Sequence, residues 1–421
     1  MLDIKFIREN SDLIKENCKN RLAKIDIDAL LSLDKKSRDL ESKIEALRAE
    51  RNLGSKTKPT PEQIDKIRKV GDTILELEKE LAPIRDELEQ ILLQVPNLSH
   101  PKVKISQDED ECVILEQKYN PTEFAFAPLD HVELAEKLDL IDFERGTKVA
   151  GSKFYFLKNE LVMLELALMN YTFEIVMKHG FTPIITPDLA SREILARMGY
   201  NPRGESTQVY NIENSDLSLV GTSEITMGGF HKDETLEEKE LPKKYVALSH
   251  CFRTEAGSYS KFSKGIFRVH QFTKIEMFMY VTPEAAESAH EEMLTIEKEI
   301  FGGLGIPFRV IDHTSSDLGA PSYRTFDLEA WMPGKPNKDG SLGDWAEITS
   351  TSNCTDYQAR ALSIKYKTAD GKKDFVNTIN GTGVAFPRAM IAILENYQQK
   401  DGSVKMPEAL HKYLPFKEII K

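Results

Sequence analysis

The sequence predicts an α+β protein, in which an N-terminal antiparallel coiled-coil hairpin precedes a domain built on an antiparallel β-sheet with flanking helices. Leucine and isoleucine recur at alternating spacings of three and four between Asp34 and Gln94, which is typical of paired helices. Segments rich in β-branched and aromatic residues gather later in the chain and indicate strands. The clearest of these segments are FTPIITPDL, YVALSHCFRT, IFRVHQFTKIEMFMYV, FRVIDHT and TFDLEAWM.

The hairpin is predicted from two heptad runs with a helix breaker between them. The breaker is GSKTKPTP, residues 54–61, whose glycine and prolines end a helix and reverse the chain. With a rise of about 1.5 Å per residue, each helix of roughly 30 residues is on the order of 45 Å long. The apolar positions are Leu40, Ile44 and Leu47, then Ile64, Ile67, Val70, Ile74, Leu77, Leu81, Ile84, Leu88 and Ile91.

Basic residues gather in the outer half of this hairpin, although the whole chain has a formal net charge of -12. Any nucleic-acid site is therefore expected to be a local patch. A charged outer face is also what a plain solvated coiled coil carries, so the pattern allows either a simple surface or a phosphate-binding arm. The basic residues of this half are Lys43, Arg48, Arg51, Lys56, Lys58, Lys66, Arg68 and Lys69.

The polar stretch VPNLSHPKVKISQDEDE follows the hairpin and predicts a boundary near residue 105, with domains at 1–105 and 106–421.

The four cysteines are far apart and match no zinc or disulfide spacing. The acidic residues near the N-terminus are unlike a signal peptide, and no apolar run approaches the length of a membrane span. We therefore expect a cytoplasmic protein with no membrane partner. P-loop, Rossmann and Gly-x-Ser-x-Gly motifs are absent from the sequence.

The first candidate for chemistry is Arg253-Thr254-Glu255, at the end of a predicted strand, followed by a glycine-containing loop and a second strand with Arg268 and Phe272. Side chains two apart on a strand share a face, so Arg253 and Glu255 could be an ordinary solvated salt bridge. Together with the second strand, the same residues suit a purine nucleotide. The cations would bind phosphate, the carboxylate an exocyclic amine, and the ring would stack on the base.

Two further groups of polar residues stand out. Thr222-Ser223-Glu224 and Glu276 could hold an ammonium and a hydroxyl, although Thr222 is equally well explained as a helix N-cap. Glu347 and Ser350 offer the oxygen ligands that Mg²⁺ takes beside phosphates. Arg388 opens a predicted amphipathic helix, where it could bind an anion or pair with an acid.

In this order, these groups resemble the three signature motifs of class II aminoacyl-tRNA synthetases, and their wording is similar to that of bacterial seryl-tRNA synthetases. The resemblance implies a class II catalytic domain that activates serine with ATP to seryl-adenylate and pyrophosphate. Serine would then pass to the 3′ end of tRNA(Ser), and of tRNA(Sec) where the host has one. The segments that carry the resemblance are MLDIKFIREN, LRAERN, VPNLSHP, GFTPIITP, GTSE, FRTEAGSYSKFSKGIFRVHQFTKIEMF, EITSTSNCTDYQAR and NGTGVAFPRAMIAILENYQ.

The resemblance also implies a role for each matching residue. Arg253, Arg268 and Arg388 would be the catalytic cations, with Arg253 and Arg268 on the phosphates and Arg388 either stacked on adenine or in contact with phosphate. Mg²⁺ would bind Glu347 and Ser350. The implied ATP site consists of Arg253, Thr254, Glu255, Arg268, Val269, Phe272, Glu347, Ile348, Thr349, Ser350 and Arg388. The implied serine site consists of Thr222, Ser223, Glu224, Arg253, Glu276, Asn380 and Thr382.

Two partners are implied in the same way. Pro187 resembles the motif 1 proline, which helps build the homodimer interface in this class. The hairpin would grip the long variable arm of the tRNA through shape and backbone contacts. The candidate contacts are Arg48, Arg51, Lys56 and Lys58.

Two rival functions fit parts of the sequence. A paralogue that loads an amino acid onto a carrier protein is expected to lack the hairpin. A non-catalytic RNA-binding relative is expected to lack Arg253, Glu255 or Arg388, and the chain retains all of these features. This chain departs from the usual sequence of the family at two places. It has Pro387 where many relatives have glycine, and its segment DLGAPSYRTFDLE differs from the usual alanine-rich one.

Overall fold

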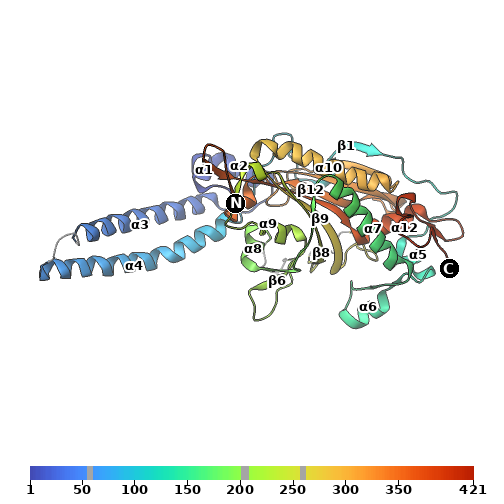
Figure 1. Ribbon diagram of the computed structural model, residues 1–421, viewed down its shortest axis with the longest axis horizontal. Coiled ribbons are helices and arrows are strands. Elements are labelled where there is room, and N and C mark those ends of the chain that lie inside the picture. The colour runs from blue at the N-terminus through green and yellow to red at the C-terminus, as the bar shows by residue number, and fades with distance from the viewer. Residues whose placement is uncertain (55–59, 201–207, 257–261) are drawn as a thin grey trace. The chain divides into compact units, whose positions relative to one another are not determined.

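The computed structural model describes residues 1–54, 60–200, 208–256 and 262–421 (Figure 1). These residues form two compact units, Met1–Leu98 and Ser99–Lys421. The first unit is helical and the second combines helices with a large sheet, so the predicted α+β class is confirmed. Within the described ranges, no helix is both long enough and apolar enough to cross a membrane.

The first unit contains the predicted helical hairpin, whose two long helices α3 and α4 lie side by side in Figure 1. The seam between them buries four side chains of the predicted heptads, namely Leu40, Ile44, Ile74 and Leu81. Helix α4 begins with a capping box, in which the Thr60 hydroxyl accepts from the Gln63 backbone N–H and the Gln63 side chain accepts from the Thr60 N–H. The helices are α1 Ile4–Glu9, α2 Ser11–Asn20, α3 Ile27–Gly54 and α4 Pro61–Leu92.

The seam ends before the position that the heptad pattern predicts. Ile64 is 54% exposed, so the prediction that it belongs to the packed seam is wrong. Ile64 lies in the first turn of α4, directly after the cap at Thr60, and the buried seam does not extend to this turn. In the same part of the hairpin, the exposed side chains of Lys66 and Glu50 make an ion pair of 2.8 Å.

The second unit is built on an eight-stranded sheet with the order β1-β10-β11-β12-β15-β9-β8-β4. Neighbouring strands are antiparallel except for β4, which joins the edge parallel to β8. The strands of this sheet are β1 Val113–Lys118, β4 Thr182–Ile185, β8 Lys243–Phe252, β9 Gln271–Val281, β10 Phe308–Asp312, β11 Arg324–Pro336, β12 Leu342–Asn353 and β15 Asn377–Ala385. Small additional sheets consist of β2 Ile141–Asp142 with β3 Phe156–Leu157, β5 Leu189–Ser191 with β6 Leu217–Leu219, β7 Thr235–Glu237 with β13 Lys365–Lys367 and β14 Lys373–Phe375, and β16 Val404–Lys405 with β17 Glu418–Ile419.

Three long helices, α7, α10 and α12, pack against the sheet, and α7 also contacts the other two. Their apolar faces and the inner strands form the main hydrophobic core of the unit. Shorter helices connect the strands around this core. The helices of the unit are α5 His131–Lys137, α6 Phe143–Ala150, α7 Glu160–Lys178, α8 Arg192–Arg197, α9 Ser223–Gly228, α10 Ala286–Gly303, α11 Tyr357–Ala361 and α12 Phe386–Tyr397.

Helix α10 is fixed to strand β12 by two buried polar side chains. The ring nitrogen Nε2 of His290 lies 3.0 Å from the Thr351 carbonyl oxygen, and the Thr349 hydroxyl donates to the Glu297 carboxyl at 2.9 Å. Burial lowers the pKa of His290 to about 4, so the neutral ring donates to that carbonyl at neutral pH. These contacts hold the middle of β12 in one register against the helix.

A bulge in β12 decides which of its side chains share a face. Thr349 pairs with Leu328 and Glu347 pairs with Glu329, so Ile348 has no partner opposite it. In a regular strand, Glu347 and Ser350 are three residues apart and point to opposite faces. The extra residue brings both side chains to the wall of one cavity.

Candidate active site

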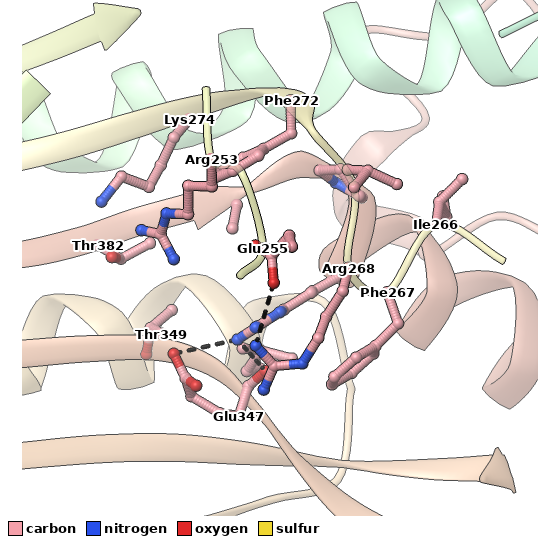
Figure 2. Close-up of a pocket in the computed structure, with 15 residues that line it drawn as sticks. Arg253, Glu255, Ile266, Phe267, Arg268, Phe272, Lys274, Glu347, Thr349 and Thr382 are labelled. Carbon is pink, nitrogen blue, oxygen red and sulfur yellow. Dashed lines mark hydrogen bonds and ion pairs between the residues drawn. The ribbon is translucent and has the colours of Figure 1, made fainter. Parts of the chain in front are cut away.

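Two adjoining cavities in the second unit contain most of the predicted site residues. Figure 2 shows the first, here called the cationic cavity, which is lined by Arg253, Arg268, Arg388 and Lys274 among other residues. The second, here called the polar cavity, has a volume of about 450 Å³ and is lined mostly by hydroxyl, amide and carboxylate side chains. The residues that line both cavities are Arg253, Lys274, Glu347 and Thr382.

Arg253 lies directly after β8, where its side chain is held on two sides. Its backbone N–H donates to the His270 carbonyl at 3.0 Å, and its Nε donates to the Gly221 carbonyl at 3.3 Å. The guanidinium lies 5.3 Å from the centroid of the Phe272 ring, which is the range of a cation–π contact. A flat cation and a flat ring are therefore presented side by side at the cavity wall.

The other two arginines of the cationic cavity are each close to a carboxylate. Arg268 Nη1 lies 3.6 Å from Glu255 Oε2, and Arg388 Nη1 lies 3.0 Å from Glu347 Oε1 (Figure 2). Glu255 has a positive φ of 53°, a backbone conformation that non-glycine residues rarely adopt and that often marks functional sites. Loss of hydration opposes the ionisation of Glu347, but the charge of Arg388 outweighs it and lowers the pKa of this carboxyl.

Arg388 is positioned by the start of α12, two residues after the helix begins at Phe386. Its guanidinium lies 4.8 Å from the Phe267 ring, and its Nη1 also donates to the Glu347 carbonyl at 3.0 Å. Together with Phe272, Phe267 gives the cavity two aromatic rings, each with an arginine over it. Such a cavity suits a ligand that is both planar and anionic.

Strands β9 and β15 supply one wall of the polar cavity. Lys274 and Glu276 are two apart on β9, both are buried, and they form an ion pair. Thr382 on β15 pairs with Glu276 in register, and its hydroxyl donates to Glu276 Oε2 at 3.3 Å. The wall thus offers a hydroxyl, an ammonium and a carboxylate within one small patch.

Glu224 forms a second acidic position in the polar cavity. It follows Thr222, whose hydroxyl accepts from the Glu224 backbone N–H at 3.2 Å as the N-cap of α9. The N-cap prediction is therefore confirmed, and the cap itself turns Glu224 towards the cavity. Burial is the main cause that raises the pKa of Glu224, and the charge of Glu276 adds to it.

Three donors converge on the Glu224 carboxyl. Tyr200 Oη donates to Oε2 at 2.7 Å, and Gln358 Nε2 and Asn380 Nδ2 donate to Oε1 at 2.8 and 3.2 Å. Gln358 accepts in turn from the Thr378 hydroxyl at 2.7 Å. This network fixes the orientation of Glu224 and leaves its remaining lone pairs for a ligand.

A third cluster lies where β10 and β11 meet the polar cavity. His313 Nε2 is 2.9 Å from Asp327 Oδ2, and His313 Nδ1 is 3.0 Å from Asp317 Oδ2. Burial disfavours the charged ring, but the two carboxylates outweigh it and raise the pKa of His313 to about 12. Asp327 pairs with Ser350 across the sheet, and its Oδ1 is buried with no hydrogen-bond partner. This oxygen-rich corner therefore retains unused acceptor capacity.

The predicted site residues come together with few exceptions. Ser223 is fully buried and, like Thr254, does not line either cavity. Lys56 and Lys58 lie outside the described residues. The predicted residues that line one or both cavities are Thr222, Glu224, Arg253, Glu255, Arg268, Val269, Phe272, Glu276, Glu347, Ile348, Thr349, Ser350, Asn380, Thr382 and Arg388.

The sequence analysis missed several residues of the site, among them His313 and Asp317 of the third cluster. Lys274 had a signal, because it lies two residues before Glu276 and so shares its strand face. Phe267 immediately precedes Arg268, but only the fold places its ring under Arg388. Tyr200 and Gln358 gave no signal, because only the fold brings them to Glu224.

Family models, relatives and solved structures all point to the same protein family. Residues 1–99 match the family described as the seryl-tRNA synthetase N-terminal domain, and residues 208–397 match the tRNA synthetase class II core domain (G, H, P, S and T). The chain is 51% identical over 426 residues to a serine–tRNA ligase of Treponema denticola, covering 100% of both chains. It is 47% identical over 428 residues to a serine–tRNA ligase of Dictyoglomus thermophilum, covering 100% of this chain and 99% of the other. A solved seryl-tRNA synthetase from Pyrococcus horikoshii, complexed with ATP, has a TM-score of 0.89 and 38% identity, covering 100% of this chain and 99% of that one.

We predict that Glu224→Gln raises the melting temperature of the protein at neutral pH. Because burial raises the pKa of Glu224 in the folded state, the wild type loses stability as the pH rises through that pKa and the buried carboxyl ionises. Glutamine has the same shape and does not ionise, so its advantage should grow as the pH rises above the ordinary pKa of a glutamate carboxyl. Thermal unfolding as a function of pH measures the effect, with the exposed Glu213→Gln as control. A difference that does not change with pH would contradict the explanation.

Proposed function

Because the chain belongs to the seryl-tRNA synthetase family, we propose that its two cavities carry out one reaction in two steps. Serine is activated with ATP to seryl-adenylate and pyrophosphate, and the seryl group then passes to the 3′ end of tRNA(Ser). The observation that carries this proposal is the junction of the cavities. A cationic cavity suited to a nucleoside triphosphate meets a polar cavity suited to a small zwitterion at Arg253 and Lys274.

We assign the nucleotide to the cationic cavity. Arg253 binds the α-phosphate, Arg268 the γ-phosphate, and Glu255 accepts from the adenine amino group. Phe272 and Arg388 stack on the two faces of the base. The contacts of the site support this assignment, because each of these cations lies against a ring or a carboxylate that a base or a phosphate can replace.

We assign serine to the polar cavity. The hydroxyl lies at Glu276 and Thr382, and the ammonium lies at Thr222 and Glu224. Buried carboxylates at these positions favour a ligand that brings donors to both ends. Alanine would leave the Glu276 carboxylate without its partner, and a site built to bind a hydroxyl rejects an analogue that lacks it by a factor of about 10⁴. Threonine is excluded because its methyl group needs additional space.

The chemistry requires positioned charge more than proton transfer. A serine carboxylate oxygen bonds to the α-phosphorus, the bond from this phosphorus to the bridging oxygen breaks, and pyrophosphate leaves. Negative charge grows on the phosphoryl oxygens, where Arg253 and Arg268 stabilise it. In the second step the terminal hydroxyl of the tRNA attacks the seryl carbonyl carbon, and the bond from this carbon to the mixed-anhydride oxygen breaks. AMP leaves with that oxygen, and its phosphate takes up the proton of the hydroxyl.

We propose that Mg²⁺ accompanies ATP and binds Glu347 and Ser350. When bound, the ion neutralises phosphate charge. The residues fit it: a carboxylate and a hydroxyl share one cavity wall, and the neighbouring Asp327 has an unused buried oxygen. Among the residues that the structure describes, no three His, Cys, Asp or Glu side chains are arranged to hold a metal. Two protein ligands, such as Glu347 and Ser350, are typical of Mg²⁺, because phosphates and water complete its coordination shell.

Two observations favour the synthetase over the two rival functions. A paralogue that charges a carrier protein would not need the hairpin, which is present and packed. A non-catalytic relative would not need the three arginines, which all line the cationic cavity.

We place the enzyme in the cytoplasm, where its substrates occur and where its four free cysteines stay reduced. Charging of tRNA(Sec) follows the same route in hosts that have this tRNA.

We expect serine-dependent ATP–pyrophosphate exchange, with little exchange for threonine, alanine or glycine. Arg253→Ala should reduce the exchange rate at least a hundredfold, because a cation on the reacting phosphate stabilises the transition state by several kcal/mol. The assay is run on wild type and variant with each of the four amino acids. Exchange that depends on another amino acid would contradict the serine assignment, and its absence would contradict activation altogether.

We propose that the first unit binds tRNA through the outer half of the hairpin. Arg51 is exposed there, and Arg48 Nη2 lies 2.6 Å from Glu78 Oε1. The double variant Arg48→Ala/Arg51→Ala should lower kcat/KM for tRNA about tenfold and reduce its salt dependence, since two phosphate contacts are lost. Pyrophosphate exchange should be unchanged. Arg38→Ala, near the other end of α3, is the control, and an equal loss in this control would contradict the assignment.

We propose a homodimer formed at the β4 edge of the sheet. Ile185 in the edge strand β4 is 79% exposed, and Pro187 follows two residues later. Helix α7, which contacts β4, also exposes Met163 and Leu166. Apolar side chains on an open strand edge are commonly covered by a partner. Sedimentation should therefore show a dimer that Ile185→Asp dissociates. Ile114→Asp, on the opposite edge strand β1, should leave the dimer intact. A wild-type monomer would contradict the proposal.

A further inference from the structure

A cluster outside the two cavities contacts the segment that carries Arg268. Asp130 caps helix α5, with its Oδ1 accepting from the Val132 and Glu133 N–H groups at 2.9 and 3.1 Å. Its Oδ2 accepts from the ammonium of Lys264 in a very short ion pair. Lys264 lies four residues before Arg268, in the segment that leads into β9. One end of this segment is therefore fixed to α5.

A buried carboxylate joins α5 to the helix that carries Arg388. Glu395 is on α12, and its Oε1 accepts from the His131 backbone N–H at 3.0 Å and from the ring Nδ1 at 2.8 Å. Its Oε2 accepts from the Gly334 N–H of β11 at 2.8 Å. The side chains of His131 and Glu395 are only 1% and 2% exposed, so this connection is shielded from water.

The backbone of the segment lies directly on this cluster. Gly265 has a φ of +57°, and a Cβ there would be 2.2 Å from His131 Nε2, so no larger residue fits. The next turn is closed by the Phe267 N–H, which donates to the Lys264 carbonyl at 3.1 Å. Phe267 is also the ring beneath Arg388. The same few residues thus touch both the segment of Arg268 and the surroundings of Arg388.

We propose that Asp130, His131, Lys264 and Glu395, here called the α5 clamp, are positioning residues that hold Arg268 and Arg388 at the spacing ATP requires. This inference rests on the proposed assignment of ATP to the cationic cavity. Arg268 and Arg388 are 120 residues apart in the sequence, and each is close to a carboxylate of the cationic cavity. The clamp provides a fixed reference for both, because α5 contacts the segment through Lys264 and α12 through Glu395.

Lys264→Met tests the clamp at its half-exposed member, where folding should survive. Calorimetric titration with ATP and Mg²⁺, without serine, should show binding about tenfold weaker than wild type, because misplaced phosphate ligands lose alignment. Lys264→Arg should restore most of the affinity, since it keeps the charge that Asp130 binds. Lys137→Met is the matched control, because Lys137 lies on α5 and its Nζ donates to the exposed Asp401 carbonyl at 2.7 Å, not to Asp130. Its ATP affinity should equal that of the wild type.

Kinetics distinguish positioning from a general loss of structure. In pyrophosphate exchange, Lys264→Met should raise KM for ATP about tenfold and leave KM for serine within about twofold, because only the nucleotide ligands move. A purely structural role would lower the active fraction and leave both KM values unchanged, which would overturn the inference. Wild-type affinity for ATP in Lys264→Met would also overturn it. Wild-type protein that binds ATP but shows no serine-dependent exchange would instead contradict the proposed function.

Discussion

The catalytic unit depends on the constraint that charges buried near one another need fixed partners. Glu224 and Glu276 lie in one cavity, and the pKa of Glu224 is raised by burial and by this neighbour. An isolated buried carboxylate is unfavourable unless hydrogen bonds or a cation compensate for the lost hydration. Lys274 provides that cation for Glu276, and Tyr200, Gln358 and Asn380 provide the hydrogen bonds for Glu224. The sheet supplies Lys274 from β9 and Asn380 from β15, whereas Tyr200 follows α8 and Gln358 lies on α11, so the partners come from distant parts of the chain.

Much of the fold follows from patterns that act over short distances. The heptads of α3 and α4 and the β-branched and aromatic residues of β8 and β9 were readable because each depends on residues a few positions apart. Ile64 was predicted wrongly because the pattern of one helix does not say whether its partner offers an apolar surface. The parallel pairing of β4 with β8 was also not predictable, since the strand order is decided by the packing of the whole unit.

The candidate site also has a part that the sequence predicts and a part that it does not. The segments around Arg253 and Arg388 each match a recognisable sequence motif, so their residues could be named before the fold was known. The bulge at Ile348 could not be read from the sequence, although it decides that Glu347 and Ser350 share a wall. The α5 clamp also gave no sequence signal, because His131 and Glu395 are 264 residues apart. Such contacts are properties of the fold as a whole.

The ion pairs of the cationic cavity have a consequence for how a nucleotide would enter it. Arg268 and Arg388 lie against the carboxylates of Glu255 and Glu347, so the charge of these two arginines is already partly balanced within the protein. Under the proposed function, a triphosphate enters by ion exchange, in which internal anions are displaced from their cations by the incoming ones. Added salt competes with both sets of pairs at once, so nucleotide affinity depends less on ionic strength than the number of arginines suggests. Under the same proposal, the Mg²⁺ that accompanies the nucleotide would give Glu347 a new cation in place of Arg388.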